Sequence, residues 1–275
     1  LCTSHWKCVA ASAVGTMHAR MHAPCQDAFG ERRLPNGLLL MAVADGAGTA
    51  RYSAYGSKTA VMTALADLDL ELRFRIPTDE DTWTRVLTAV FQKAATAVFH
   101  QAQFYGDSPR EYASTLVVVA ASVNWIVSGM VGDGALVILD RSNRLLCVTT
   151  PQRGEYANAT NFITGNHMLQ HLAVEFRQEQ VNGIAVMTDG LLNLSVSLPD
   201  NEPFADFFDP LFRFLDVSTN EQQAADSLKR FLMSERVNRR TDDDKTLLLA
   251  LREIDTVLPE VPECDLKPQA VASWS

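Results

Sequence analysis

The chain has 275 residues, a formal net charge of -9 and 47% hydrophobic residues, which fits a globular protein with one large or two small domains. The acidic balance argues against a nucleic-acid binder, because such proteins usually carry a basic face. Five cysteines without a Cys-x-x-Cys pair indicate reduced thiols rather than a disulfide framework. No apolar run is long enough for a membrane span and the N-terminal residues lack a signal-peptide pattern, so we expect a cytoplasmic protein without membrane contact.

The first half of the chain is predicted to contain strands followed by helices. Residues 6–17 favour one or two strands. Residues 38–44 are apolar on both faces, which indicates a buried strand, and they end in Asp45-Gly46. Two helices are predicted at 53–70 and 79–104, the second with apolar residues at the three-and-four spacing of one helical face.

The second half reads mainly as strands. An antiparallel meander is predicted at 115–122, 125–131, 135–140 and 145–150. The polar residues 151–180 suggest a long loop or flap, and 183–188 form a buried strand that ends in Asp189-Gly190. Ser218-Thr219-Asn220-Glu221 has the pattern of a capping box at a helix start, and 246–251 are the last predicted strand.

The order of these elements predicts an α+β architecture in which helices cover sheets. No repeat or linker divides the chain, so we expect a single domain over residues 1–254. The proline-rich residues 255–275 are expected to form a loose C-terminal tail.

Aspartates recur where predicted strands end. Three Asp-Gly pairs occupy such positions at Asp45, Asp133 and Asp189, and an acidic run at 242–244 precedes the last strand. Each pair taken alone is more often a turn than a ligand, and Asp133-Gly134 has the pattern of a hairpin turn. As a set, carboxylates at strand ends can converge at one sheet edge, where they repel one another unless a cation lies among them. Magnesium and similar hard cations prefer such oxygen ligands, and two bridged ions can activate a water toward a phosphoryl group.

The ordered motifs resemble the metal-dependent type 2C protein serine/threonine phosphatases, and most closely a divergent bacterial branch of that family. They span about residues 10 to 252, and six of them follow the family's order: Cys25-Gln26-Asp27-Ala28-Phe29, Val43-Ala44-Asp45-Gly46-Ala47-Gly48, Ser114-Thr115-Leu116-Val117-Val118, Val131-Gly132-Asp133-Gly134, Met187-Thr188-Asp189-Gly190 and Asp243-Asp244-Lys245-Thr246-Leu247. The resemblance implies a four-layer β-sandwich of two antiparallel sheets flanked by helical pairs. It also implies a centre of two Mg²⁺ or Mn²⁺ ions between the sheets.

The resemblance also implies a role for each aspartate. Asp45 matches the bridging ligand, and Gly46 matches the residue that offers its backbone carbonyl. Asp189 and Asp243 match ligands of the second ion. Two further carboxylates complete the set: Asp27 matches a water-mediated one, and Asp133 matches the one linked to a weaker third ion.

The chain departs from the family pattern at the groups that handle phosphate. The phosphate-binding arginine would fall at His22, and Arg20 is the nearest alternative. Ala47 occupies the position where some members have a general-acid histidine. We therefore hypothesise that His18 or His22 binds phosphate or protonates the leaving group, against the simpler interpretation of hydrogen-bonded loop residues.

The leading interpretation is a phosphatase that removes phosphate from phosphoserine and phosphothreonine in proteins, by direct attack of a metal-activated water centred on Asp45 and Asp189. Its partners would be phosphorylated proteins made by a serine/threonine kinase, and we expect a monomer. A catalytically silent relative that acts as a binding or regulatory module is the alternative. A third class, with an aspartyl nucleophile, lacks its strand-end Asp-x-Asp here.

Overall fold

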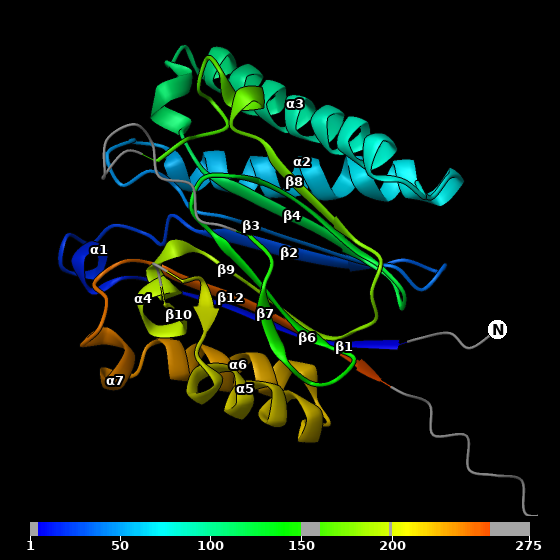
Figure 1. Cartoon of the computed structure of the whole chain (residues 1–275). Coiled ribbons are helices and arrows are strands. Elements are labelled where there is room, and N and C mark those ends of the chain that lie inside the picture. The colour runs from blue at the N-terminus through cyan, green and yellow to red at the C-terminus, as the bar shows by residue number, and fades with distance from the viewer. Residues whose placement is uncertain (1–4, 150–159, 198–199, 254–275) are drawn as a thin grey trace, which may run out of the picture.

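Two five-stranded antiparallel sheets lie face to face, and helices cover the outer face of each (Figure 1). This is a computed structural model, and it describes residues 5–149, 160–197 and 200–253. The strands of one sheet are, in spatial order, β1 (His5–Ala13), β12 (Lys245–Glu253), β9 (Val181–Met187), β6 (Ala135–Asp140) and β7 (Leu145–Cys147). Those of the other are β2 (Ala28–Arg33), β3 (Leu39–Ala44), β4 (Leu116–Ala121), β5 (Ile126–Val131) and β8 (Ala173–Arg177). The expected sandwich of two antiparallel sheets is confirmed.

Two pairs of helices form the outer layers. Helices α2 (Ser53–Phe74) and α3 (Glu80–Tyr105) pack on the β2–β8 sheet, while α5 (Ala205–Val217) and α6 (Glu221–Leu232) pack on the β1–β7 sheet. The short helices α1 (Thr16–Arg20), α4 (Leu192–Ser195) and α7 (Glu235–Asn238) gather at the left-hand end of Figure 1. The remaining elements are short: the pair β10 (Val196–Ser197) and β11 (Glu202–Pro203), and the 3-10 turns η1 (Pro109–Tyr112), η2 (Met168–Gln170) and η3 (Asp189–Leu191).

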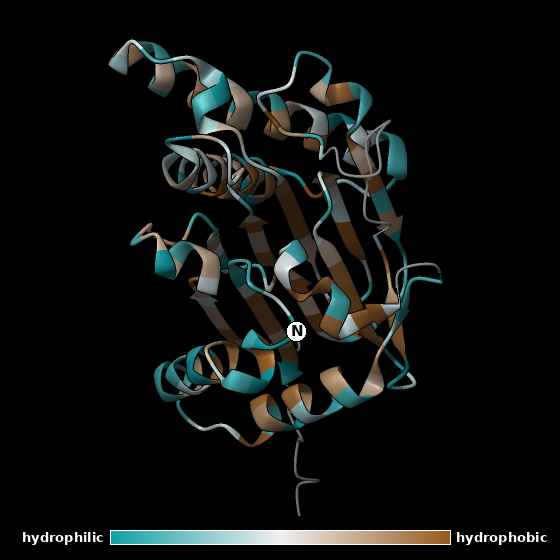
Figure 2. Cartoon of the chain, turned by 90° about the vertical axis from the view of Figure 1, so that its left-hand side faces the viewer, coloured by the Kyte–Doolittle hydropathy of each residue, from teal (hydrophilic) through white to brown (hydrophobic). Residues whose placement is uncertain are grey.

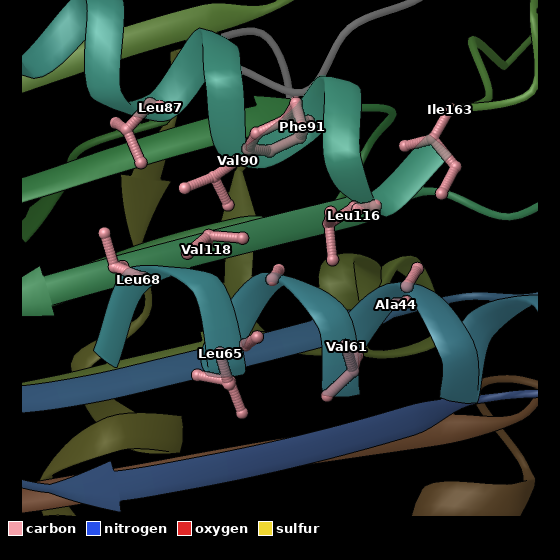
Figure 3. Close-up of a cluster of buried hydrophobic side chains, with 14 of the residues drawn as sticks. Ala44, Val61, Leu65, Leu68, Leu87, Val90, Phe91, Leu116, Val118 and Ile163 are labelled. Carbon is pink, nitrogen blue, oxygen red and sulfur yellow. The ribbon is translucent and has the colours of Figure 1, made fainter. Parts of the chain in front are cut away.

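Strand β3 shows why the apolar runs are continuous. Leu40 and Ala42 face α2 and α3, while Leu39 and Met41 face the other sheet. Successive side chains of a strand point to opposite faces, so a strand in the middle of four layers needs apolar residues at every position. Figure 3 shows the helix-covered side of this core, and Figure 2 shows the hydrophobic strands lying inside helices of mixed character.

The predicted meander is wrong at its centre. Strands β4 and β5 pair as a hairpin, but β5 and β6 lie in different sheets. The Gly132-Asp133-Gly134 segment therefore crosses from one sheet to the other, and the interpretation of Asp133-Gly134 as a hairpin turn is incorrect. Gly132 has φ +113°, a conformation that glycine adopts readily because it lacks a Cβ.

Other differences concern the ends of elements. The first strand stops at Ala13, and α1 occupies part of the predicted 6–17 strand region. Strand β8 lies inside the 151–180 segment expected to be a loop. Residues 151–159 of that segment, like the 255–275 tail, are outside the described residues. The capping box is wrong in register, because Asn220 caps α6 by accepting from Gln223 N at 3.0 Å. Ser218 instead donates to the carbonyl of Phe214 at the end of α5.

Four of the Asp-bearing loops open at one end of the sandwich, beside α1, α4 and α7 (Figure 1). They follow β3 and β9, precede β12, and link β5 to β6. Among the described residues, no helix is long and apolar enough to cross a membrane.

Candidate active site

The Asp45-Gly46 loop is fixed against the start of β4. Asp45 N donates to Thr115 Oγ1 at 2.9 Å, and Thr115 N donates back to the Asp45 carbonyl at 2.8 Å. A Cβ on Gly46 would lie 2.7 Å from the Gln26 carbonyl oxygen and 2.8 Å from Ser53 Cβ. Only glycine fits there, so the sequence holds the backbone of this loop in one place while the Asp45 side chain stays half-buried.

Asp189 and Asp243 are brought together by strand pairing. Asp189 follows β9 and Asp243 precedes β12, and these strands pair with Met187 opposite Leu247. A Cβ on Gly190 would collide with the Asp244 carbonyl oxygen, so the two loops touch backbone to backbone. This close approach explains why glycine follows the aspartate at this strand end.

Asp27 lies beside the same strand ends and is held by two hydroxyl groups. Thr188 Oγ1 and Thr246 Oγ1 donate to its Oδ2 at 2.8 and 2.7 Å. Asp27 shares a hydrogen bond with Asp45 when one of the pair carries a proton. When both are ionised, the buried Asp27 Oδ1 has no donor facing it.

Asp133 shows the same pattern as Asp27. Thr160 Oγ1 donates to its Oδ2 at 2.8 Å, while the buried Oδ1 has no hydrogen-bond partner. A buried carboxylate oxygen without a donor is costly, so its position calls for a cation or water.

The five aspartates repel one another. Burial, then the negative charges of Asp27 and Asp189, raise the pKa of Asp45 well above its ordinary value. Burial, followed by repulsion from Asp133 and Asp243, raises the pKa of Asp189 to about 8. Mainly through burial, the pKa of Asp27 is raised to about 6, even though its hydroxyl partners act in the opposite direction.

The pKa values of Asp133 and Asp243 are raised as well, again chiefly by burial. Each of the five carboxylates is therefore harder to ionise than in water, and a nearby divalent cation would reverse that effect.

The donor set fits hard divalent ions. It offers carboxylates whose mutual repulsion a cation would relieve, and two orphaned buried carboxylate oxygens. Within 5–149, 160–197 and 200–253, no three His, Cys, Asp or Glu side chains form a ready-made cage around one ion. Magnesium keeps several of its waters and binds through one or two carboxylates, so such a cage is not required.

Asp244 takes a different part from Asp243. It is almost fully buried, and its carboxylate accepts the backbone N–H groups of Gly15 and Gln26, each at 2.6 Å. His18 is also buried, with Nδ1 3.0 Å from Asp244 Oδ2, although that nitrogen is not angled for a hydrogen bond. The structure thus places His18 against an anchoring carboxylate.

Arg20 is the last residue of the short helix α1, His22 follows two residues later, and both are exposed. His22 has φ 55°. In the part of the chain that the structure describes, neither side chain makes an ion pair or a hydrogen bond to another side chain. They are the free polar groups of the loop that carries Asp27.

Three supporting residues were not assigned a role from the sequence: Thr115, Thr188 and Thr246, which orient the aspartate loops. Each lies in or next to a strand-end motif, and this position in the sequence could have marked it as a supporting residue. Which of these hydroxyl groups faces a carboxylate depends on strand register, which no local pattern gives.

Comparisons with known proteins identify the family of the chain. The sequence profile of the family Protein phosphatase 2C matches residues 14–233. "Serine/threonine-protein phosphatase 3" of Escherichia coli (strain K12) is 34% identical over 253 residues, covering 90% of this chain and 98% of the relative.

Solved structures share the fold at lower sequence identity. PppA of Pseudomonas aeruginosa, described as a key regulatory component of T6SS, has a TM-score of 0.60 and 20% identity, covering 91% of this chain and 99% of its own. The catalytic domain of the serine/threonine protein phosphatase PstP, solved with two manganese ions, has a TM-score of 0.59 and 19% identity, covering 92% of this chain and 100% of its own. On the extent of the profile match and the identity to the E. coli relative, this chain belongs to the protein phosphatase 2C family.

Proposed function

We propose that the carboxylate cluster at the end of the sandwich hydrolyses phosphoserine and phosphothreonine in proteins with the help of bound Mg²⁺ or Mn²⁺. Family membership supports a serine/threonine protein phosphatase. The observation that carries the site assignment is the convergence of five aspartates with raised pKa values on the edge where the β3, β9 and β12 loops meet.

Each aspartate has a proposed part in metal binding. Asp45 would bridge two ions, and the Gly46 carbonyl would contribute to one of them. Asp189 and Asp243 would bind the second ion. Asp27 would act through a water, and Asp133 would serve a third, weaker site.

Bound divalent ions supply Lewis acidity and lower the pKa of a water enough for it to attack phosphorus at neutral pH. The protein's own residues fix the geometry. Thr188 and Thr246 hold Asp27 Oδ2, and Thr115 holds the Asp45 backbone. Such pre-set orientation reduces the rearrangement needed in the transition state.

We assign phosphate binding and proton donation to residues at the end of α1 and just after it. Arg20 and His22 are exposed and precede Asp27 by seven and five residues, and they lack competing partners in the described structure. An arginine suits phosphate because its planar fork makes paired charge-assisted hydrogen bonds. Buried His18, held near Asp244, is less suited to proton transfer than exposed His22.

The proposal also covers the identity of the metal ion and the oligomeric state. The manganese ions of PstP support manganese or magnesium as the ion here. Every proposed ligand comes from one chain, so the proposal needs only a monomer, acting on the products of a serine/threonine kinase.

The test is hydrolysis of a phosphoserine peptide during a manganese titration, with wild type, Asp189→Ala and Asp133→Ala compared. We expect activity only with added metal, loss of turnover in Asp189→Ala, and a weaker metal response in Asp133→Ala. Asp209→Ala, an exposed change on α5, is the control and should behave as wild type. Full activity of the wild type in excess chelator would contradict the proposal, and so would full activity of Asp189→Ala.

A further inference from the structure

A large apolar groove lies on the helical layer outside the β1–β7 sheet, between α5, α6 and α7. It has a volume of about 750 Å³. Its lining is mainly aromatic and aliphatic, and includes Phe204, Phe207, Pro210, Phe214, Phe231 and Val237. Phe204 is 41% exposed, and Phe207, Phe214 and Phe231 are half-buried at the edge of the core. The side chains of these residues therefore offer apolar surface that the described part of the chain does not cover.

The lining of the groove is close in sequence to two of the aspartates in the cluster. Asn193 and Leu194 line it, and their helix α4 directly follows the turn that begins at Asp189. Arg240 also lines it and precedes Asp243 by three residues. Consecutive Cα atoms are about 3.8 Å apart, so Arg240 and Asp243 are separated by at most about 11 Å. A peptide bound in the groove can reach the cluster within a few residues.

Charge narrows the kind of peptide that fits. Arg236 and Arg240 are exposed at the rim, and neither has an ion pair among the described residues. The chain as a whole has a net charge of -9, and the two arginines place positive charge at the rim of the groove. Asp206 is the acidic residue of the lining, near the start of α5. An apolar groove with arginines at the α7 rim is complementary to a segment with apolar anchors and acidic residues.

We propose that this groove is a docking site for the phosphoprotein substrate, which it binds through an acidic segment with apolar anchors a few residues away from the phosphorylated serine or threonine. The inference rests on the proposed function and names the class of substrate that the site prefers. The apolar anchors occupy the aromatic lining, and the acidic residues face Arg236 and Arg240. Docking of this kind lowers KM for substrates that carry the segment and leaves the chemical step unchanged.

Two phosphoserine peptides of equal length test the preference. One carries Leu, Phe and several Glu residues at three to eight positions from the phosphoserine, and the other has Lys in place of each Glu. Wild type should hydrolyse the acidic peptide with a lower KM and a similar kcat. The aryl phosphate p-nitrophenyl phosphate, which cannot reach the groove, measures the metal-dependent chemistry alone.

Two variants and one matched control locate the effect. Arg236→Glu/Arg240→Glu should raise KM for the acidic peptide about three- to tenfold and remove the preference over the Lys peptide, since exposed charge pairs contribute modestly. Phe204→Ser should raise KM for both peptides through loss of the apolar contact, and serine at this helix start is a favoured N-cap. Lys229→Glu, an exposed charge reversal on α6 at a residue outside the lining, is the control for each arginine change and should leave all values unchanged.

Binding of the same acidic peptide with unphosphorylated serine, followed by fluorescence anisotropy, separates docking from catalysis. Wild type should bind it, and the double arginine variant should bind it several-fold more weakly. Equal KM values for the two peptides in wild type would overturn the docking proposal, as would an equal loss of aryl phosphate turnover in the arginine variant. If the groove variants changed self-association in sedimentation experiments but left KM unaffected, the groove would bind a second copy of the chain. That result would also overturn the docking proposal. If wild type binds the peptide but hydrolyses neither substrate with metal present, the proposed function fails while the docking site stands.

Discussion

His18 Nδ1 lies 3.0 Å from Asp244 Oδ2, and both side chains are almost fully buried. The same carboxylate accepts the backbone N–H groups of Gly15 and Gln26. Asp244 is adjacent to the proposed metal ligand Asp243. The start of β12 therefore uses one aspartate to face the cluster and the next to anchor the loop that carries Asp27.

Asp244→Ala should destabilise the protein. The change leaves the buried N–H group of Gly15 and the partly buried N–H group of Gln26 without an acceptor, at about 1–3 kcal/mol for each orphaned group. We expect urea unfolding to show a loss of about 2–4 kcal/mol in the free energy of unfolding. Asp242→Ala, at an exposed neighbouring position, is the control. A difference of less than about 0.5 kcal/mol between the two variants, the range of ordinary surface changes, would refute the anchoring role.

Gly190→Ala should damage both fold and site. The added Cβ would collide with the carbonyl oxygen of Asp244, so the loops of Asp189 and Asp243 must move apart. Overpacking of this kind costs about 1–3 kcal/mol, and we expect phosphopeptide turnover to fall together with the thermal midpoint. At Gly48 a Cβ would meet nothing within 4 Å, so Gly48→Ala is the matched control. Equal activity of the two variants would show that the close approach of the loops is dispensable.

The sequence predicted most elements because their patterns are local. The apolar run of β3 and the helical spacing within α3 reflect the burial of single elements. The β5–β6 crossover was missed because Gly132-Asp133-Gly134 has the composition of a hairpin turn, and only the pairing partners distinguish the two arrangements. Helix α5 was not delimited, since Pro210 lies inside it and interrupts the usual signal.

In the site as well, local features could be predicted from the sequence, and features that depend on distant residues could not. The Asp-Gly pairs could be identified from the sequence. The resemblance to type 2C phosphatases linked these pairs to the other motifs in one order along the chain. The separate parts of Asp243 and Asp244 could not be told apart by pattern, because adjacent acidic residues look alike until their side chains point in different directions. His18 was proposed for catalysis from its position in sequence, whereas its burial against Asp244 depends on a residue more than 200 positions away.

The stability of the metal-free protein should fall as pH rises from about 5 to 8. Folding raises the pKa of Asp27 to about 6 and of Asp189 to about 8, above the value of about 3.9 for an unfolded aspartate. The native state binds more protons over this range, so its stabilisation is complete below about pH 4 and is lost as pH rises through 8.

Urea unfolding in chelator at pH 5 and pH 8 measures this trend, and Asp189→Asn should reduce it. Saturating Mn²⁺ should remove it, because the cation replaces the protons and binds more tightly as they leave. Metal-free stability that stays constant or increases over the same interval would be inconsistent with the repulsion between the carboxylates.

Calorimetric titration of Mn²⁺ into metal-free protein, with wild type compared with Asp45→Asn, measures metal binding by the aspartate cluster most directly. Wild type should bind two ions and release protons to the buffer at pH 7, because the pKa of Asp189 is raised to about 8 in the absence of metal and the pKa of Asp45 is raised as well. Asp45→Asn should lose at least one ion, since Asp45 is proposed to bridge both. Wild type that binds no Mn²⁺, or an Asp45→Asn variant that binds two ions with unchanged affinity, would contradict the assignment of this cluster as the metal centre.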